Sequence, residues 1–402
     1  MTDRVTVHHA MRVISQDRKT VVLRLHPLPS LLGSAYMHKR LAFIDTLRGI
    51  AVLCVLLQHV LEQIVLTGQT GAAEGMLHGL IGYYFNFGRF GVVLFFFVSG
   101  FVVPYSFPDS AAPVRDFAVS RFFRLYPMYW LSIILALAIL PTAEAKVFPV
   151  WQVLVNLTMF QNVIGLPNMV VAHWTLAIEL IFYIGCVVLF ATGLLRRSTA
   201  VFVIVISISC AGIILPMLFE QRIVSRLLEV VLNLDAMLIG KITRDTVMGR
   251  KLRWWHVAIC LGLYSAFAMV IFKRLYGGDY QGNFFYSYSI ASAYVAAGFT
   301  FVTFACYGDR LASRGLTFIG MISYSVYLMQ VYVLAAAVHY FGAGSSLPQW
   351  MLFAASVVSV TILISWASFY AVEKPAVAFG RTYRSRRSAG AEAMPVPEQG
   401  VA

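Results

Sequence analysis

Long apolar runs separated by short polar segments fill the chain from about residue 42 onward. A helix rises about 1.5 Å per residue, so it needs about 20 apolar residues to cross a hydrocarbon core of roughly 30 Å. The runs lie near 42–66, 79–105, 125–140, 150–163, 172–194, 199–219, 226–241, 254–272, 286–306, 315–341 and 349–372. The pattern therefore predicts an all-α protein that crosses a membrane many times.

The run at 150–163 is too short to span. It is interrupted by Asn156, Gln161 and Asn162, and would cover only about 21 Å as a helix. If it does not cross, ten helices remain, and the positive-inside rule places most lysines and arginines on the side of both termini. We therefore expect about ten transmembrane helices, cytoplasmic termini and a partly buried, non-spanning excursion over 150–172. Irregular backbone of this kind is expected to border a site.

Composition supports a membrane protein and narrows its partners. The 402 residues are 59% hydrophobic and 12% charged, with a mean hydropathy of +0.76. The net charge is +13, but the basic residues are scattered through short loops, so no nucleic-acid partner is expected. The five cysteines lie inside apolar runs without paired spacing, and no closely spaced His, Cys and acidic residues predict a metal site.

The two ends of the chain differ from its middle. Residues 1–40 are basic and lack the apolar stretch of a signal peptide, so they predict a disordered tail, within which Met37 is an alternative start. Residues 41–376 predict one transmembrane domain. The polar stretch 377–402 predicts a disordered cytoplasmic tail.

One apolar run carries two polar residues that are costly in hydrocarbon. The stretch LRGIAVLCVLLQH contains Arg48 and, eleven positions later, His59. Eleven residues turn a helix by about 1,100°, so both side chains share one face about 16 Å apart along the axis. The arginine suits a phosphate-bearing ligand, and a deeper neutral imidazole suits removal of a proton from a hydroxyl. The alternative for His59 is a hydrogen-bonded packing role.

This run also resembles the signature of a membrane enzyme family. IDTLRGIAVLCVLLQHV is similar to the pattern of an arginine, ten residues and a histidine in the acyltransferase-3 family of integral membrane O-acyltransferases. Further stretches resembling that family's motifs are GRFGVVLFFFVSGFVV (88–103), SRFFRLYPMYW (120–130), HWTLAIEL (173–180), GMISYSVYLMQ (320–330) and EKP (373–375). Two positions depart from the family pattern: Val93 stands where an acid is common, and Gln330 where a histidine is common.

The resemblance implies a reaction, its substrates and a location. An acyl group, usually acetyl, would move from a cytoplasmic acyl-CoA to a hydroxyl of a glycan or glycolipid. Acyl-CoA would be a co-substrate, with no bound cofactor. The protein would be integral to a bacterial inner membrane. The alternative function is a membrane transporter of a sugar, lipid or acyl group, although no inverted repeat is evident.

Residue roles follow from these motifs together with side-chain chemistry. His59 would act as general base, and Glu179 would orient its imidazole or bind sugar hydroxyls. Trp174 and Gln330 are the predicted acceptor-binding residues. The predicted acyl-donor-binding residues are Arg48, Arg89, Arg121, Arg124 and Tyr126.

Structural alternatives remain open for several of these residues. The arginines of 120–130 also fit positive-inside anchoring, and Trp174 also fits a membrane interface. Arg89 lies in the middle of an apolar run and needs a partner, for which Glu179, Asp45 or a ligand would serve. Ser99 fits close helix packing better than an acyl-serine mechanism.

Overall fold

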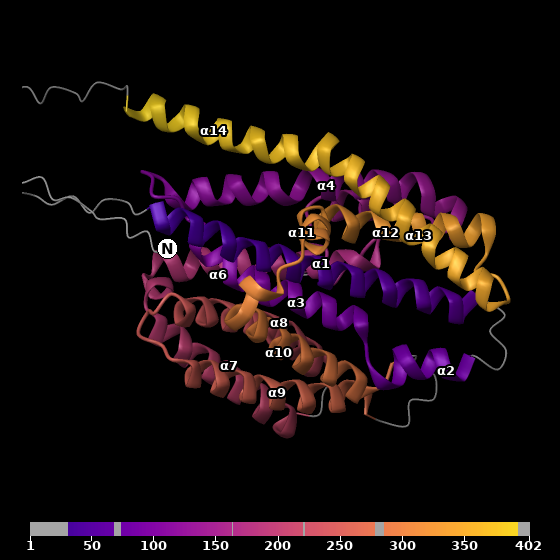
Figure 1. Cartoon of the computed structure of the whole chain (residues 1–402), viewed down its shortest axis with the longest axis horizontal. Helices are drawn as coiled ribbons and strands as arrows, with labels where there is room; N and C mark the ends of the chain where they lie inside the picture. The colour runs from indigo at the N-terminus through magenta and orange to yellow at the C-terminus, as the bar shows by residue number, and fades with distance from the viewer. Residues whose placement is uncertain (1–30, 68–73, 163, 220–221, 278–284, 393–402) are drawn as a thin grey trace, which may run out of the picture. The chain divides into compact units, whose positions relative to one another are not determined.

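The described part of the chain is helical throughout. The computed structural model describes residues 31–67, 74–162, 164–219, 222–277 and 285–392. The chain divides into two units, Met1–His38 and Lys39–Ala402, and the helix packing belongs to the second. In chain order the elements are α1 (Leu31–Thr67), α2 (Glu74–His78), η2 (Gly79–Tyr84), α3 (Phe87–Val102), η3 (Val103–Tyr105), α4 (Pro113–Ala143), α5 (Val150–Asn156), η4 (Val171–His173), α6 (Trp174–Ala191), η5 (Leu194–Arg196), α7 (Ser198–Leu218), α8 (Arg222–Val247), α9 (Trp254–Tyr276), α10 (Ser287–Leu311), α11 (Arg314–Met321), α12 (Ser323–Phe341), α13 (Leu347–Ser368), η6 (Phe369–Glu373) and α14 (Lys374–Glu392) (Figure 1).

Nine helical runs within the described residues are long and apolar enough to cross a membrane. Helix α8 is not among them because charged residues interrupt it, yet it has 26 residues and packs against α3, α7 and α9. Its charges meet partners inside the bundle, such as Glu229 with Arg89 and Lys241 with Asp245. The predicted polytopic all-α fold is confirmed, with nine candidate spans in the described residues and α8 as a further long helix in the bundle.

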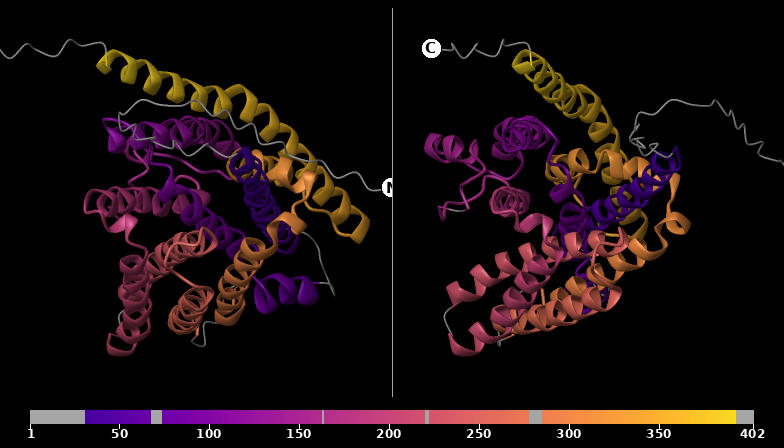
Figure 2. Two further views of the ribbon diagram at one scale, coloured as in Figure 1. Left: turned by 60° about the vertical axis from the view of Figure 1, so that its left-hand side comes forward. Right: turned by 90° about the vertical axis from the view of Figure 1, so that its left-hand side faces the viewer.

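The helices pack in two groups. Helices α3, α7, α8, α9 and α10 contact one another in one group, and α4, α12, α13 and α14 do so in the other. Figure 2 shows both groups from two further sides. Helix α6 contacts α3 and α8 of the first group. A cavity between the groups therefore draws its walls from sequence-distant helices.

Helices α3 and α8 touch at two glycines. A Cβ atom on Gly100 would overlap the carbonyl oxygen of Met237, and one on Gly240 would overlap that of Phe97. Each glycine thus lets the facing backbone approach closely. The Ser–Gly pair at 99–100 does permit close helix packing, as the sequence predicted.

Replacing Gly100 with alanine should destabilise the protein by about 1–3 kcal/mol, because the two backbones must separate to admit the methyl group. Thermal unfolding of the purified protein in detergent measures this loss. Gly185→Ala is the matched control, since nothing lies within 4 Å of a Cβ at that position of α6. Equal unfolding temperatures for the two variants would contradict the packing argument.

The predicted excursion is a short helix followed by irregular backbone. Helix α5 has only 7 residues. Asn156 is buried and donates to the carbonyl of Pro167 at 3.2 Å, while Tyr129 of α4 donates to the carbonyl of Asn156 at 2.5 Å. Tyr126 donates to the carbonyl of Thr158 at 2.9 Å. The non-spanning segment is confirmed, but its described residues up to 170 pack on α4 and do not line the cavity described below.

The C-terminal segment is not the disordered tail that its polar composition predicted. Helix α14 continues α13 through the π-helical turn η6 and packs against α4. The prediction is therefore wrong for 377–392, because contacts with α4 stabilise a helix that composition alone does not favour. In the predicted N-terminal tail, α1 is already helical from Leu31. Residues 1–30 and 393–402 lie outside the described residues.

Candidate functional site

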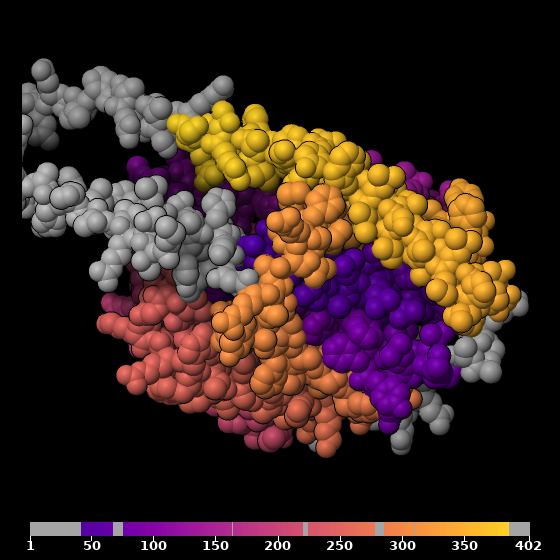
Figure 3. All heavy atoms as spheres, viewed as in Figure 1, coloured from indigo at the N-terminus to yellow at the C-terminus, as the bar shows by residue number. Residues whose placement is uncertain are grey.

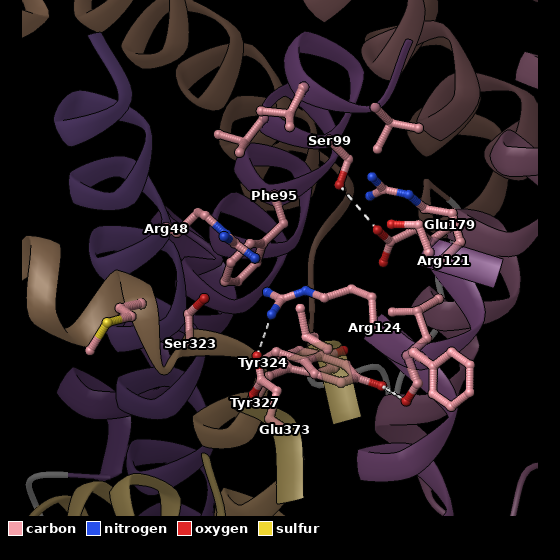
Figure 4. A pocket seen from close by; sticks show the side chains of 18 of the residues that line it. Arg48, Phe95, Ser99, Arg121, Arg124, Glu179, Ser323, Tyr324, Tyr327 and Glu373 are labelled. Carbon is pink, nitrogen blue, oxygen red and sulfur yellow. Dashed lines mark hydrogen bonds and ion pairs between the residues drawn. The ribbon is translucent and has the colours of Figure 1, made fainter. Parts of the chain in front are cut away.

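A cavity of about 650 Å³ lies between the two helix groups. Its walls come mainly from α1, α3, α4, α6, α12, η6 and α14 (Figure 4). Six basic residues of the described part of the chain line it: Arg48, Arg121, Arg124, Lys374, Arg381 and Arg384. The carboxylates in its lining are Asp45, Glu179 and Glu373. The excess of positive charge favours an anionic ligand, and the volume falls within the usual range of small-molecule sites.

Arg48 and Arg124 are held by carboxylates yet still face the cavity. Arg48 Nη1 lies 3.7 Å from Asp45, one turn earlier in α1. Arg124 forms an ion pair with Glu373, whose side chain is only 1% exposed and also accepts from the Ser325 hydroxyl at 2.7 Å. The two arginine side chains keep exposed fractions of 27% and 25%. They can therefore be oriented by protein carboxylates and still bind an anion.

Arg121 and Glu179 lie close together at another part of the wall. Arg121 precedes Arg124 by three residues, which places both on one side of α4. Its guanidinium lies 5.6 Å from the centre of the Tyr183 ring, and its Nε is buried without a hydrogen-bond partner in the described residues. Glu179 accepts from the hydroxyls of Tyr183 at 2.5 Å and Ser99 at 3.4 Å. Figure 4 shows Ser99, Glu179 and Arg121 grouped beside the cavity.

His59 is not among the residues that line this cavity. Its Nδ1 lies 3.0 Å from Glu62 Oε2, and Gln58 donates to Glu62 Oε1 at 2.9 Å. The imidazole is 39% exposed. The carboxylate that contacts it is therefore Glu62 and not Glu179, which corrects the sequence-based assignment. The spacing of three residues between His59 and Glu62 was the sequence signal for this pair.

Arg89 belongs to a separate cluster. Its Nη1 lies 2.6 Å from Glu229 Oε1, and its guanidinium lies 5.0 Å from the centre of the Trp174 ring. Glu229 is thus the partner that the sequence left open among Glu179, Asp45 and a ligand. Neither Arg89 nor Trp174 lines the cavity. The structure therefore separates Arg89 from the other predicted donor-binding arginines.

Two further predicted residues also lie away from the cavity lining. Tyr126 points to the excursion, where it donates to the carbonyl of Thr158. Gln330 is 1% exposed; its Nε2 donates to the carbonyl of Tyr327 at 3.2 Å, and its Oε1 has no partner in the described residues. The structure brings neither residue to the arginines around Arg48.

An aromatic layer lies between the cavity and the cluster around Arg89. Phe95 and Tyr327 line the cavity, with ring centroids 6.3 Å apart. Phe96 also lines it and lies 6.5 Å from the Trp174 ring, which in turn contacts Arg89. These rings therefore separate the cavity arginines from the Arg89 cluster.

One wall of the cavity was not predicted from the sequence. Glu373 was part of a recognised motif without an assigned role, and Lys374, Arg381 and Arg384 lay within or beside the predicted tail. Charge in a terminal segment does not reveal whether that segment folds back, so contacts alone identify these residues.

Comparison with known proteins assigns the chain to a family. A family model described as an acyltransferase domain, Acyl_transf_3, matches residues 41–370. Comparisons with curated proteins and with solved structures gave no match. The matched region contributes the cavity walls apart from Glu373 and α14. The chain therefore belongs to the acyltransferase-3 family of membrane acyltransferases.

Proposed function

We propose that this protein transfers an acyl group, acetyl in the first instance, from acyl-CoA to a hydroxyl of a glycan or glycolipid. The observation that carries the proposal is the cavity in which six basic residues face three carboxylates. It lies toward the start of α4 and α12 and the end of α13, which the positive-inside rule assigns to the cytoplasm. The proposal thus includes a plasma-membrane location with cytoplasmic termini.

Acyl-CoA fits this arrangement better than a compact donor such as an acyl phosphate. Arg48 lines the cavity, and His59 follows it by eleven helical residues, about 16 Å along the axis. A donor with phosphates near Arg48 needs a long arm to bring its acyl carbon toward His59. The pantetheine arm of CoA supplies that length, and its thioester must pass the rings of Phe95 and Tyr327.

The transfer uses His59 as the general base. Glu62 holds Nδ1, so the neutral ring leaves Nε2 as the proton acceptor. The acceptor oxygen attacks the thioester carbonyl carbon while Nε2 takes the hydroxyl proton. The carbon–sulfur bond then breaks, and the proton passes to the thiolate. The products are an O-acyl ester and free CoA.

Exposed aromatic residues support a sugar acceptor. Tyr83 lies at the start of the α2–α3 run, opposite the cavity end, with its ring 5.1 Å from Tyr286 and 4.8 Å from Tyr288. All three tyrosines are exposed. Such rings stack on sugars, and they also suit a membrane interface. The acceptor class itself derives from the family resemblance.

The test is acyl transfer by membranes that contain the protein and its native acceptor. With labelled acetyl-CoA, we expect base-labile label on a glycan or glycolipid. Arg48→Ala should lower kcat/KM for acetyl-CoA by about 10-fold or more, since a charge-assisted contact is worth about 1.5–3 kcal/mol. Arg314→Ala, which does not line the cavity, is the control. Movement of solute without acetyl-CoA consumption would instead identify a transporter.

A further inference from the structure

Helix α14 forms one side of the cavity. It lies after residue 370, where the match to the family model ends. It runs beside α4 in Figures 1 and 2, and Figure 3 shows it as a continuous yellow ridge along one edge of the molecule. Its cavity-lining residues include Lys374, Arg381 and Arg384. Lys374 belongs to the EKP stretch that resembles a family motif, whereas Arg381 and Arg384 lie outside both the matched region and the family-like stretches.

Small and aromatic residues hold α14 against α4. Gly380 is buried, and a Cβ at this position would lie 2.9 Å from the Cβ of Phe123. The rings of Phe123 and Phe379 meet edge to face with centroids 5.3 Å apart. A larger residue at 380 would push the helix away from α4. This contact fixes the position of Arg381, the next residue, relative to the cavity.

The three basic residues by which α14 lines the cavity share one side of the helix. Arg381 follows Lys374 by seven residues and Arg384 by three more, spacings that return to nearby faces at about 100° per residue. Lys374 Nζ lies 4.7 Å from the centre of the Tyr370 ring, and Arg384 Nε donates to the carbonyl of Gly380 at 3.4 Å. Among the side chains that the structure describes, helix α14 contributes half of the six basic residues of the lining and none of its carboxylates.

Exposure distinguishes these residues from the deeper arginines. Lys374 and Arg381 are exposed, whereas Arg124 is held by a buried carboxylate. Phosphate groups at the exposed mouth of a cavity keep part of their hydration, so cations there add affinity without a large desolvation cost. The donor proposed above has such groups on its nucleotide, at the end opposite its acyl group.

We propose that α14 binds the phosphorylated nucleotide of acyl-CoA, so that a helix outside the matched family region selects CoA thioesters over thioesters without a nucleotide. This inference rests on the proposed function. Arg381 and Arg384 contact oxygens of the nucleotide's 3′-phosphate, Arg48 and Arg124 contact those of its diphosphate, and the pantetheine arm extends from there toward the aromatic layer. The anionic headgroups of lipids present similar phosphates, and the experiment separates the two sources.

The test compares two donors in liposomes of phosphatidylcholine alone, which carry no net headgroup charge. For the double variant Arg381→Ala/Arg384→Ala, we expect kcat/KM to fall by 10-fold or more with acetyl-CoA and by less than 2-fold with S-acetylpantetheine. Inhibition by adenosine 3′,5′-bisphosphate should weaken in parallel. Gly380→Val, which displaces the helix, should give the same donor-selective loss. Arg310→Ala/Arg314→Ala, outside the lining, is the matched control.

Several outcomes would overturn the inference. Equal losses with both donors would assign α14 a structural role, and an unchanged acetyl-CoA rate would remove it from donor binding. A loss seen only when anionic lipids are added would show that the arginines bind headgroups. If the wild-type protein consumes neither donor, the proposed function fails instead. Binding of adenosine 3′,5′-bisphosphate to wild type and double variant then tests the α14 site without catalysis.

Discussion

His59→Ala is expected to reduce acyl transfer by at least about 100-fold while the protein still folds and inserts. A positioned general base contributes about 10²–10⁴-fold to a reaction that removes a proton in its transition state. His59 is 39% exposed and pairs with Glu62, so its removal opens no buried cavity. Initial rates with labelled acetyl-CoA measure the effect, and size-exclusion profiles report folding.

Two further variants sharpen this experiment. His339→Ala removes an exposed imidazole near the end of α12 and should leave the rate unchanged. Glu62→Gln keeps the shape of the side chain that contacts His59 but removes its charge, and should lower kcat by about 10-fold with little change in KM for the donor. More than half of wild-type activity in His59→Ala would remove the imidazole from the mechanism.

The second large effect concerns the ion pair between Arg124 and Glu373. Arg124→Met should destabilise the protein by about 3–5 kcal/mol, because it leaves a carboxylate that is 1% exposed without its cation. The double variant Arg124→Met/Glu373→Gln should regain most of that stability, since a neutral amide can keep the contact with Ser325. Thermal unfolding in detergent measures both.

Activity distinguishes the two roles of this pair. The stabilised double variant should still bind acetyl-CoA at least about 10-fold more weakly than wild type, because one donor-binding cation is lost. A double variant with wild-type donor affinity would show that Arg124 serves only the fold. Identical unfolding temperatures for the single and double variants would mean that the buried carboxylate is not the source of the instability.

The polytopic helical fold was predictable because the bilayer imposes a strong and local rule. Each crossing requires about 20 apolar residues, a property that can be read from the chain without knowledge of its neighbours. The same rule underestimates the length of α8, because charged residues such as Asp235 and Lys241 interrupt its apolar run. The cost of burying these charges is offset by partners on α7 and within α8 itself. The helix α14 was missed for a related reason, since its stability depends on contacts with α4.

Some of the predicted site residues line the cavity and others do not. Arg48, Arg121 and Arg124 were predicted from motifs and line one cavity, as does Glu179. Arg89, Trp174, Gln330 and Tyr126 carry equally suggestive chemistry but lie outside it. Nothing in a run of residues indicates which face of a helix meets which neighbour when almost every face is apolar.

Sequence patterns alone were enough to establish the polytopic all-α fold, to place Arg48 and His59 on one helix and to indicate the family. The pairing of the charges follows only from how the helices pack: Arg89 meets Glu229 at a separation of 140 residues, and Arg124 meets Glu373 at 249. The physical reason is that apolarity is a local requirement of each crossing. Partnering of a charge in a low-dielectric bundle depends instead on which helices pack side by side.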